Sequence, residues 1–222
     1  MPYRPLSLLT IFASAALIAL PSAASATQLI TNGGFESGSF SGPGYDVINA
    51  GGTDLTGWTV GNSLAWGVGA TDINTYAGSG YVDLTGLGDN GAHGTLSQAL
   101  ATSTGQLYTF SIFTAFTDPS VGITVSVDGV PLILTGTPGT YSGTTTTWGQ
   151  LTGMFTASSA SSALTIAGQP GASFLIGIDD VSVTGPAATG VPEPATWMMM
   201  LIGFGGIGLS MRHLRRKELA SA

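Results

Sequence analysis

The chain has 222 residues and a formal net charge of −7, with 43% hydrophobic residues, 8% charged residues and no cysteine. This apolar content excludes an acidic disordered tail, and the lack of cysteine excludes a disulfide scaffold, a thiolate zinc site and a cysteine nucleophile. Ten of the twelve carboxylates, all but Glu193 and Glu218, fall within residues 27–190, which contain no lysine or arginine. Such a surface repels phosphate, which argues against nucleic acid as a partner.

Residues 1–26 have the three parts of a secretory signal peptide. Arg4 supplies the positive charge, residues 6–20 form an apolar run broken only by serine and threonine, and Ala24-Ser25-Ala26 gives the small residues of a cleavage site. The alternative is a retained membrane anchor. The cleavage pattern favours export, with a mature chain that starts at Thr27.

Between the two ends, apolar residues alternate with a period of two, which predicts strands rather than helices. Tyr108, Phe110 and Ile112 share one face of a strand, and Asp128-Gly129 is typical of a tight hairpin. We expect strands over residues 29–31, 57–60, 64–68, 80–84, 95–100, 108–116, 123–127, 130–134, 148–155, 163–167 and 174–184. Short strands separated by Gly-, Ser- and Thr-rich turns predict an all-β fold, an antiparallel two-sheet sandwich over residues 27–184. A short linker, residues 185–191, follows it.

The last predicted strand changes its pattern part-way. Its inward-facing residues shift from one parity to the other along Phe174, Ile176, Ile178, Val181 and Val183. Keeping all of them inward requires a β-bulge near Asp179-Asp180. A bulge there would turn these two adjacent carboxylates in different directions.

The C-terminal segment has three parts in order. Pro192-Glu193-Pro194 comes first, residues 197–211 form an uncharged and mostly apolar stretch of 15 residues, and four basic residues follow between Arg212 and Lys217. The stretch is shorter than the ~20 residues that a helix needs to cross the hydrocarbon core comfortably. We expect a short transmembrane helix with the basic residues on the cytoplasmic side. An ordinary single-pass anchor is the alternative.

This order resembles the PEP-CTERM sorting signal over residues 192–217, with residues 218–222 as a tail beyond it. The resemblance implies a substrate of an exosortase in a Gram-negative bacterium that makes exopolysaccharide. Such a protein passes through the secretion machinery, is held at the membrane by residues 197–211, and is then delivered to the cell surface or the extracellular matrix of a biofilm. His213 and Leu214, which interrupt the basic cluster, depart from the family pattern.

Several motifs within residues 27–184 resemble the carbohydrate-binding, galactose-binding-like jelly rolls of bacterial surface proteins. They are Asn32-Gly33-Gly34-Phe35-Glu36, Gly57-Trp58, Leu96-Ser97-Gln98, Gly105-Gln106-Leu107-Tyr108 and Ile178-Asp179-Asp180-Val181-Ser182-Val183. The resemblance implies a jelly-roll sandwich in which the first and last strands meet and hold a structural calcium ion, with Glu36 and Asp179 as candidate ligands. The alternative is that Asp179 or Asp180 caps local backbone N–H groups.

Sugar binding requires aromatic rings with an accessible face, because an apolar ring covers the C–H face of a sugar. The candidate platforms are Trp66, Tyr76, Tyr141 and Trp148, whereas Trp58 and Phe35 are expected in the core. Packing in the core or in a turn is the alternative for each candidate.

Catalysis has little support in the sequence. His93 is the only histidine of the exported part, we expect it in a surface loop, and no G-x-S-x-G motif surrounds a serine. The sequence therefore predicts a non-catalytic surface or matrix protein, with glycan binding by its sandwich. The alternatives are a structural matrix or adhesin protein without a defined ligand, and a glycoside-active enzyme that uses two carboxylates.

Overall fold

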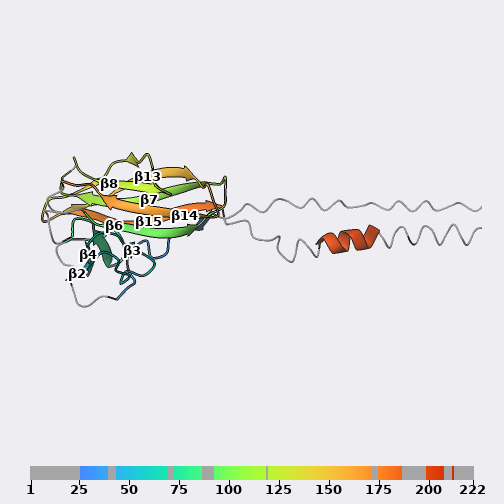
Figure 1. Cartoon of the computed structure of the whole chain (residues 1–222), viewed down its shortest axis with the longest axis horizontal. Helices are drawn as coiled ribbons and strands as arrows, with labels where there is room; N and C mark the ends of the chain where they lie inside the picture. Colours follow the sequence, from blue (N-terminus) through green and yellow to red (C-terminus); the bar gives the residue numbers. More distant parts are fainter. Residues whose placement is uncertain are drawn as a thin grey trace, which may run out of the picture.

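The computed structural model describes residues 26–39, 44–69, 73–86, 93–118, 120–171, 175–186, 199–207 and 212. Residues 1–25 of the predicted signal peptide, and the Pro192-Glu193-Pro194 motif, lie outside the described residues. Within the described part, strands that are antiparallel except for the short parallel pairing of residues 139–140 with 115–116 form two sheets that pack face to face (Figure 1). This arrangement confirms the all-β sandwich.

The larger sheet has the strand order β10-β13-β7-β15-β5-β4-β2, with β1 added beside β15, β11 beside β7 and β12 beside β11. Its strands are β1 (Ala26–Gln28), β2 (Gly44–Ile48), β4 (Leu64–Val68), β5 (Gly80–Asp83), β7 (Leu107–Phe116), β10 (Thr135–Gly136), β11 (Gly139–Tyr141), β12 (Thr146–Thr147), β13 (Gly149–Thr156) and β15 (Ile176–Pro186). The chain enters at β1 and leaves at the end of β15, and these two strands pair, so both termini of the sandwich lie at one end (Figure 1).

The smaller sheet has the order β3-β6-β14-β8-β9. Its strands are β3 (Thr59–Val60), β6 (Thr95–Ala101), β8 (Ile123–Val127), β9 (Val130–Pro131) and β14 (Ser161–Gly168). From β6 to β8, and again from β13 to β15, consecutive strands alternate between the two sheets. This crossing pattern is that of a jelly roll.

The core lies between the sheets and follows the period of two. Tyr108, Phe110 and Ile112 are all buried, whereas their neighbours Leu107 and Thr109 are exposed. The predicted bulge in β15 is also confirmed, because the register with β7 shifts between Asp179 and Ser182. Asp179 is fully buried and Asp180 is exposed with a positive φ of 45°, so the two carboxylates point to different environments.

Hydrogen bonds join the motifs near the N-terminus that resemble those of galactose-binding-like jelly rolls. Asn32, in the left-handed region with a φ of 56°, donates from its side chain to Ser37 O and Thr56 O and accepts Trp58 Nε1–H on its carbonyl. Gln98 of β6 accepts the N–H of Thr31 and donates to Thr31 O. Backbone groups of an irregular loop need such partners when they approach the core.

Some strand predictions were wrong at their bounds. Residues 29–31 are not a strand. The first strand is β1, which ends just before them at Gln28. The predicted strand 130–134 stops at Pro131. Leu132 N–H still donates to Val125 O of β8, and the chain then crosses to β10 at the edge of the other sheet. Strands β1, β2, β10, β11 and β12 were not predicted.

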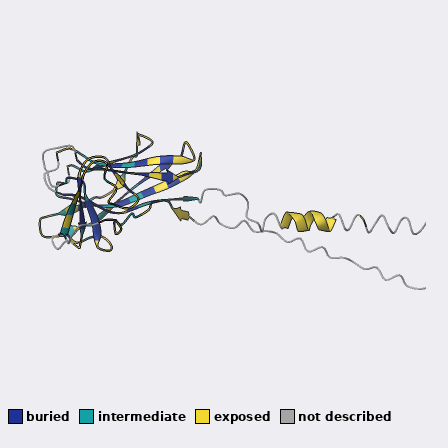
Figure 2. Cartoon of the chain, turned by 60° about the horizontal axis from the view of Figure 1, so that its bottom comes forward, coloured by how far each residue is buried: buried dark blue, intermediate teal, exposed yellow. Residues whose placement is uncertain are grey.

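Residues 199–207 form a helix whose large apolar side chains are exposed (Figure 2). Among the residues that the structure describes, no helix is both long enough and apolar enough to cross a membrane.

Candidate functional site

Residues 73–79, which we call the strap, cross the outer face of the large sheet beside β7 and β15. Phe113 has the parity opposite to the core residues of β7, and the ring of Tyr76 stacks on it with centroids 3.4 Å apart and planes 13° apart. Trp148 donates from Nε1 to Asn74 O over 2.7 Å. The strap therefore brings two of the aromatic candidates together over one sheet.

Two carboxylates fix the strap to the sandwich. Asp179 Oδ2 accepts the backbone N–H groups of Tyr76, at 2.9 Å, and Ala77, at 3.2 Å. Glu36 Oε1 accepts those of Ser79, at 2.9 Å, and Gly80, at 2.8 Å. The motif near the N-terminus and the bulge of the last strand thus act on the same short loop.

Asp179 is a fully buried carboxyl group without a cationic neighbour, since residues 27–190 contain no lysine or arginine. Burial raises its pKa from 3.8 to about 7. The backbone N–H donors of Ala77, Asp180 and Tyr76 favour the charged form and lower the pKa, but burial has the larger effect. The bulge is what holds the group there, because it turns Asp179 under the strap and Asp180 toward solvent.

The same contacts bear on the expected calcium ligands. The oxygens of Glu36 and Asp179 face N–H donors, with Glu36 Oε2 also accepting the hydroxyl of Ser79 over 2.8 Å. A calcium ion needs six to eight oxygen ligands, and in the described part of the chain no three His, Asp or Glu side chains gather around a common point. As arranged, this pair does not fit a cation shell. It fits the alternative, in which the carboxylates cap backbone N–H groups.

Trp66 does not fit the glycan-binding role predicted for it. Its side chain is only 1% exposed, and its Nε1 donates to Phe35 O over 2.9 Å in the core. The reason is that Trp66 shares the inward face of β4 with Leu64 and lies opposite Val82 of β5, and all three residues belong to the main core. A ring enclosed in this way offers no face to a sugar.

The other three candidates lie outside the main core. Tyr76 is 44% exposed, and Tyr141 and Trp148 are half-buried. Tyr141 and Trp148 pack on a second, smaller apolar cluster of Ile73, Tyr81 and Leu175, which is separate from the main core.

Sequence reasoning missed three aromatic residues that accompany these candidates. Tyr81 belongs to the smaller cluster, Tyr45 of β2 meets Tyr81 edge-on with centroids 6.3 Å apart, and Phe113 lies beneath Tyr76. The parity of Phe113, opposite to Ile112, was a signal that could have found it. We call Tyr45, Tyr76, Phe113, Tyr141 and Trp148 the aromatic belt.

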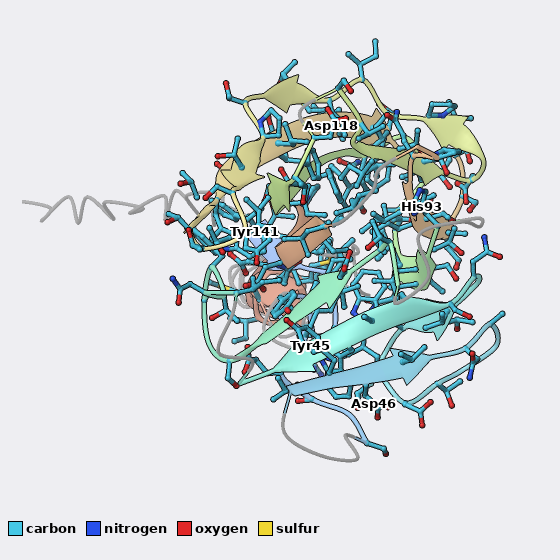
Figure 3. The ribbon with its side chains drawn as sticks, turned by 90° about the vertical axis from the view of Figure 1, so that its left-hand side faces the viewer. Tyr45, Asp46, His93, Asp118 and Tyr141 are labelled. Atoms are coloured by element: carbon cyan, nitrogen blue, oxygen red, sulfur yellow. The ribbon has the colours of Figure 1, made fainter. Side chains whose placement is uncertain are left out.

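His93 is buried, at 5% exposure, and not in a surface loop as predicted. Its neighbour Gly94 pairs through its backbone with Leu84 and Gly168, which closes the sheets around the ring. Within the described residues, His93 Nδ1 has no hydrogen-bond partner. In Figure 3, His93 and Tyr141 of the belt lie on opposite sides of the molecule.

Comparison with known proteins identifies the C-terminal signal. The family model described as the PEP-CTERM protein-sorting motif matches residues 190–217, which confirms the sorting signal predicted at 192–217. No curated protein matches the chain.

Several solved structures are similar to the sandwich. The CBM22-1 xylan-binding domain of Paenibacillus barcinonensis Xyn10C aligns at 15% identity over 67% of this chain and 100% of its own, with a TM-score of 0.42. A family 35 carbohydrate-binding module from Clostridium thermocellum aligns at 11% identity over 63% and 96%, with a TM-score of 0.39. TmCBM61, solved with β-1,4-galactotriose, aligns at 20% identity over 71% and 97%, with a TM-score of 0.40.

Proposed function

We propose that this chain is an exported, non-catalytic surface or matrix protein of a Gram-negative bacterium, sorted by an exosortase, whose sandwich binds a neutral glycan. The match of residues 190–217 to the PEP-CTERM motif supports export and sorting. In this proposal the apolar residues 197–211 hold the exported chain at the membrane until the enzyme acts on the Pro192-Glu193-Pro194 region.

The observation that carries the glycan proposal is the convergence of aromatic rings from separate strands. Tyr76 comes from the strap, Tyr141 from β11, Trp148 from the residue before β13 and Tyr45 from the edge strand β2. Rings with one face or edge open to solvent and the other packed on protein are suited to covering the C–H face of a sugar. Backbone groups and hydroxyls of the strap, such as those near Asn74 and Thr75, supply polar partners for sugar hydroxyls.

The charge of the sandwich indicates which class of glycan it would bind. Without lysine or arginine in residues 27–190, the sandwich has no cation to pair with a uronate or a sulfate. Its carboxylates would repel such groups. We therefore expect a neutral polysaccharide rather than an acidic one.

A glycan array probed with the exported chain tests this function. Binding should fall strongly in Tyr76→Ala and Trp148→Ala and persist in Leu107→Ala, a matched control on the same sheet face that lies outside the aromatic belt. Melting curves of each variant separate lost binding from lost folding. No binding to any neutral matrix sugar would contradict glycan recognition and favour the alternative of a structural matrix protein.

Sorting is tested separately by intact mass. Replacing Pro192-Glu193-Pro194 by three alanines should leave the protein in the membrane fraction at its longer mass, whereas the natural chain should be recovered shortened from the surface. Unchanged processing of the variant would refute the sorting proposal without touching glycan binding.

The calcium site that the sequence predicted at Glu36 and Asp179 has its own test. An ion that binds only the folded state raises the melting temperature by mass action. Because both carboxylates already accept N–H groups, we expect equal melting curves in calcium and in EDTA. A higher melting temperature in calcium would show that the strap rearranges to admit the ion.

A further inference from the structure

An apolar patch lies away from the aromatic belt, around the edge where β9, β10 and β13 meet. Its members are Leu107, Val130, Ile133 and Met154, with exposed fractions of 55%, 67%, 86% and 64%. The other strongly exposed large apolar residues of the described sandwich, Tyr45, Val47 and Tyr76, are each below 45%. The most exposed apolar side chains of the sandwich are therefore concentrated here.

The patch is continuous in space. Ile133 and Met154 both line two adjoining shallow pockets, of about 350 and 390 Å³. Val130 lines the first of these pockets. Leu107 pairs with Thr156, and Met154 with Thr109, so Leu107 and Met154 are diagonal neighbours on the outer face of the sheet.

The charge around the patch is low. Among the described carboxylates, only Asp128 lines either pocket, and its Oδ1 accepts the N–H of Ala163. The other described acidic residues do not line either pocket: Asp46 is on β2, Asp83 on β5, Asp179 and Asp180 on β15, and Glu36, Asp54 and Asp118 in loops. Four neighbouring exposed large apolar side chains on an otherwise acidic domain indicate a contact with an apolar partner.

The position of the patch along the chain indicates which partner. Leu107 and Thr109 begin β7, and Thr109 pairs with Thr184 near the end of β15, where the chain leaves the sandwich. Twelve residues separate the end of β15, at Pro186, from the helix 199–207, whose exposed side chains include Leu201, Ile202 and Phe204. Twelve residues span at most ~40 Å, so a membrane that holds this helix lies within reach of the patch.

We propose that the patch rests on the lipid bilayer while the chain is held there by its C-terminal segment, with Ile133 entering the interface between headgroups and acyl chains. This inference rests on the membrane-held stage of the proposed function. Apolar side chains enter the interface of a neutral bilayer without basic residues, which fits a domain that has none. The contact orients the tethered sandwich, because Phe113 of the aromatic belt lies six residues, or roughly 20 Å, along β7 from Leu107.

The absence of cysteine allows a direct test. Ile133→Cys and, as a matched control, Val47→Cys on edge strand β2 each carry one thiol for an environment-sensitive fluorophore. The exported chain, with its C-terminal segment intact, is reconstituted with phosphatidylcholine vesicles. Flotation measures the tether, and quenching by lipids brominated in their acyl chains measures the contact.

We expect several-fold stronger lipid quenching at position 133 than at position 47. A chain that floats with equal, weak quenching at both positions overturns the membrane contact and leaves the tether intact. A chain that does not float overturns the tether and the contact together. A fluorescence shift at position 133 that depends on protein concentration and not on lipid would assign the patch to a second copy of the chain, and would also overturn the proposal.

Discussion

The buried carboxyl group of Asp179 should make the stability of the sandwich fall as the pH rises from about 4 to about 7. Burial raises its pKa from 3.8 to about 7, so between these values the folded chain holds a proton that the unfolded chain has released. The folded state is favoured at the acid end of this window and loses that advantage as the pH passes the folded pKa. Since each pH unit corresponds to about 1.4 kcal/mol per proton, the free energy of unfolding should drop by about 4 kcal/mol.

The perturbation is Asp179→Asn, which keeps the shape of the side chain and removes its titration. Urea unfolding of the chain in a mild nonionic detergent can be followed by the fluorescence of Trp58 and Trp66, which are both buried. Near pH 4 the variant and the natural chain should be about equally stable. Near pH 8 the variant should be more stable by about 4 kcal/mol, because it has no charge to bury.

Asp180→Asn is the control, because Asp180 is adjacent and exposed and should keep most of the natural pH dependence. Hydrogen bonds from Ser120 lower the pKa of Asp118 from 3.8, so its contribution is lost only below this window and does not overlap it. Parallel pH profiles for the natural chain and Asp179→Asn would refute the reasoning. They would show that the three N–H donors outweigh desolvation and keep Asp179 charged.

Three further substitutions test the parts of the site. Glu36→Gln should cost about 1 kcal/mol and speed amide hydrogen exchange at Ser79, because the strap loses its charged acceptor; unchanged exchange would argue against this role. Gly33→Ala should cost about 2 kcal/mol or more, since a Cβ there would overlap Val181 O, and a normal melting temperature would contradict the packing. Trp66→Ala should cost about 3–5 kcal/mol as a core residue, and a stable variant that loses only sugar binding would restore its predicted role.

The sequence was most informative where one face of a strand is buried. The period of two in Tyr108, Phe110 and Ile112 located β7, and the change of parity in the last strand located the bulge at Asp179. Neither pattern could show what covers the outer face of the sheet. The strap is a turn-rich segment without periodicity, and its position depends on long-range bonds to Glu36 and Asp179 that only the folded chain brings together.

The errors have the same origin. Trp66 and His93 were judged from their local neighbours, a strand with mixed pattern and a Gly-rich loop. Their burial depends on segments distant in sequence: Trp66 packs in the main core and donates to Phe35 O, and Gly94 beside His93 pairs with Gly168. Edge strand β2 was missed because Gly44 and Asp46 are poor strand formers, and tertiary pairing with β4 overrides that preference.

A sandwich without lysine or arginine cannot form ion pairs with these side chains, so its carboxylates need other hydrogen-bond donors. Five of them accept backbone N–H groups, from Ser79 to Glu36, Thr85 to Asp83, Ser120 to Asp118, Ala163 to Asp128 and Tyr76 to Asp179. These bonds replace ion pairs as the means of fixing loops, and salt does not compete with them as it does with exposed ion pairs. The remaining electrostatic effect is repulsion among like charges, which salt screens. The melting temperature should therefore hold or rise slightly from low to high sodium chloride, and a clear fall would mean that attractive charge pairs stabilise the fold after all.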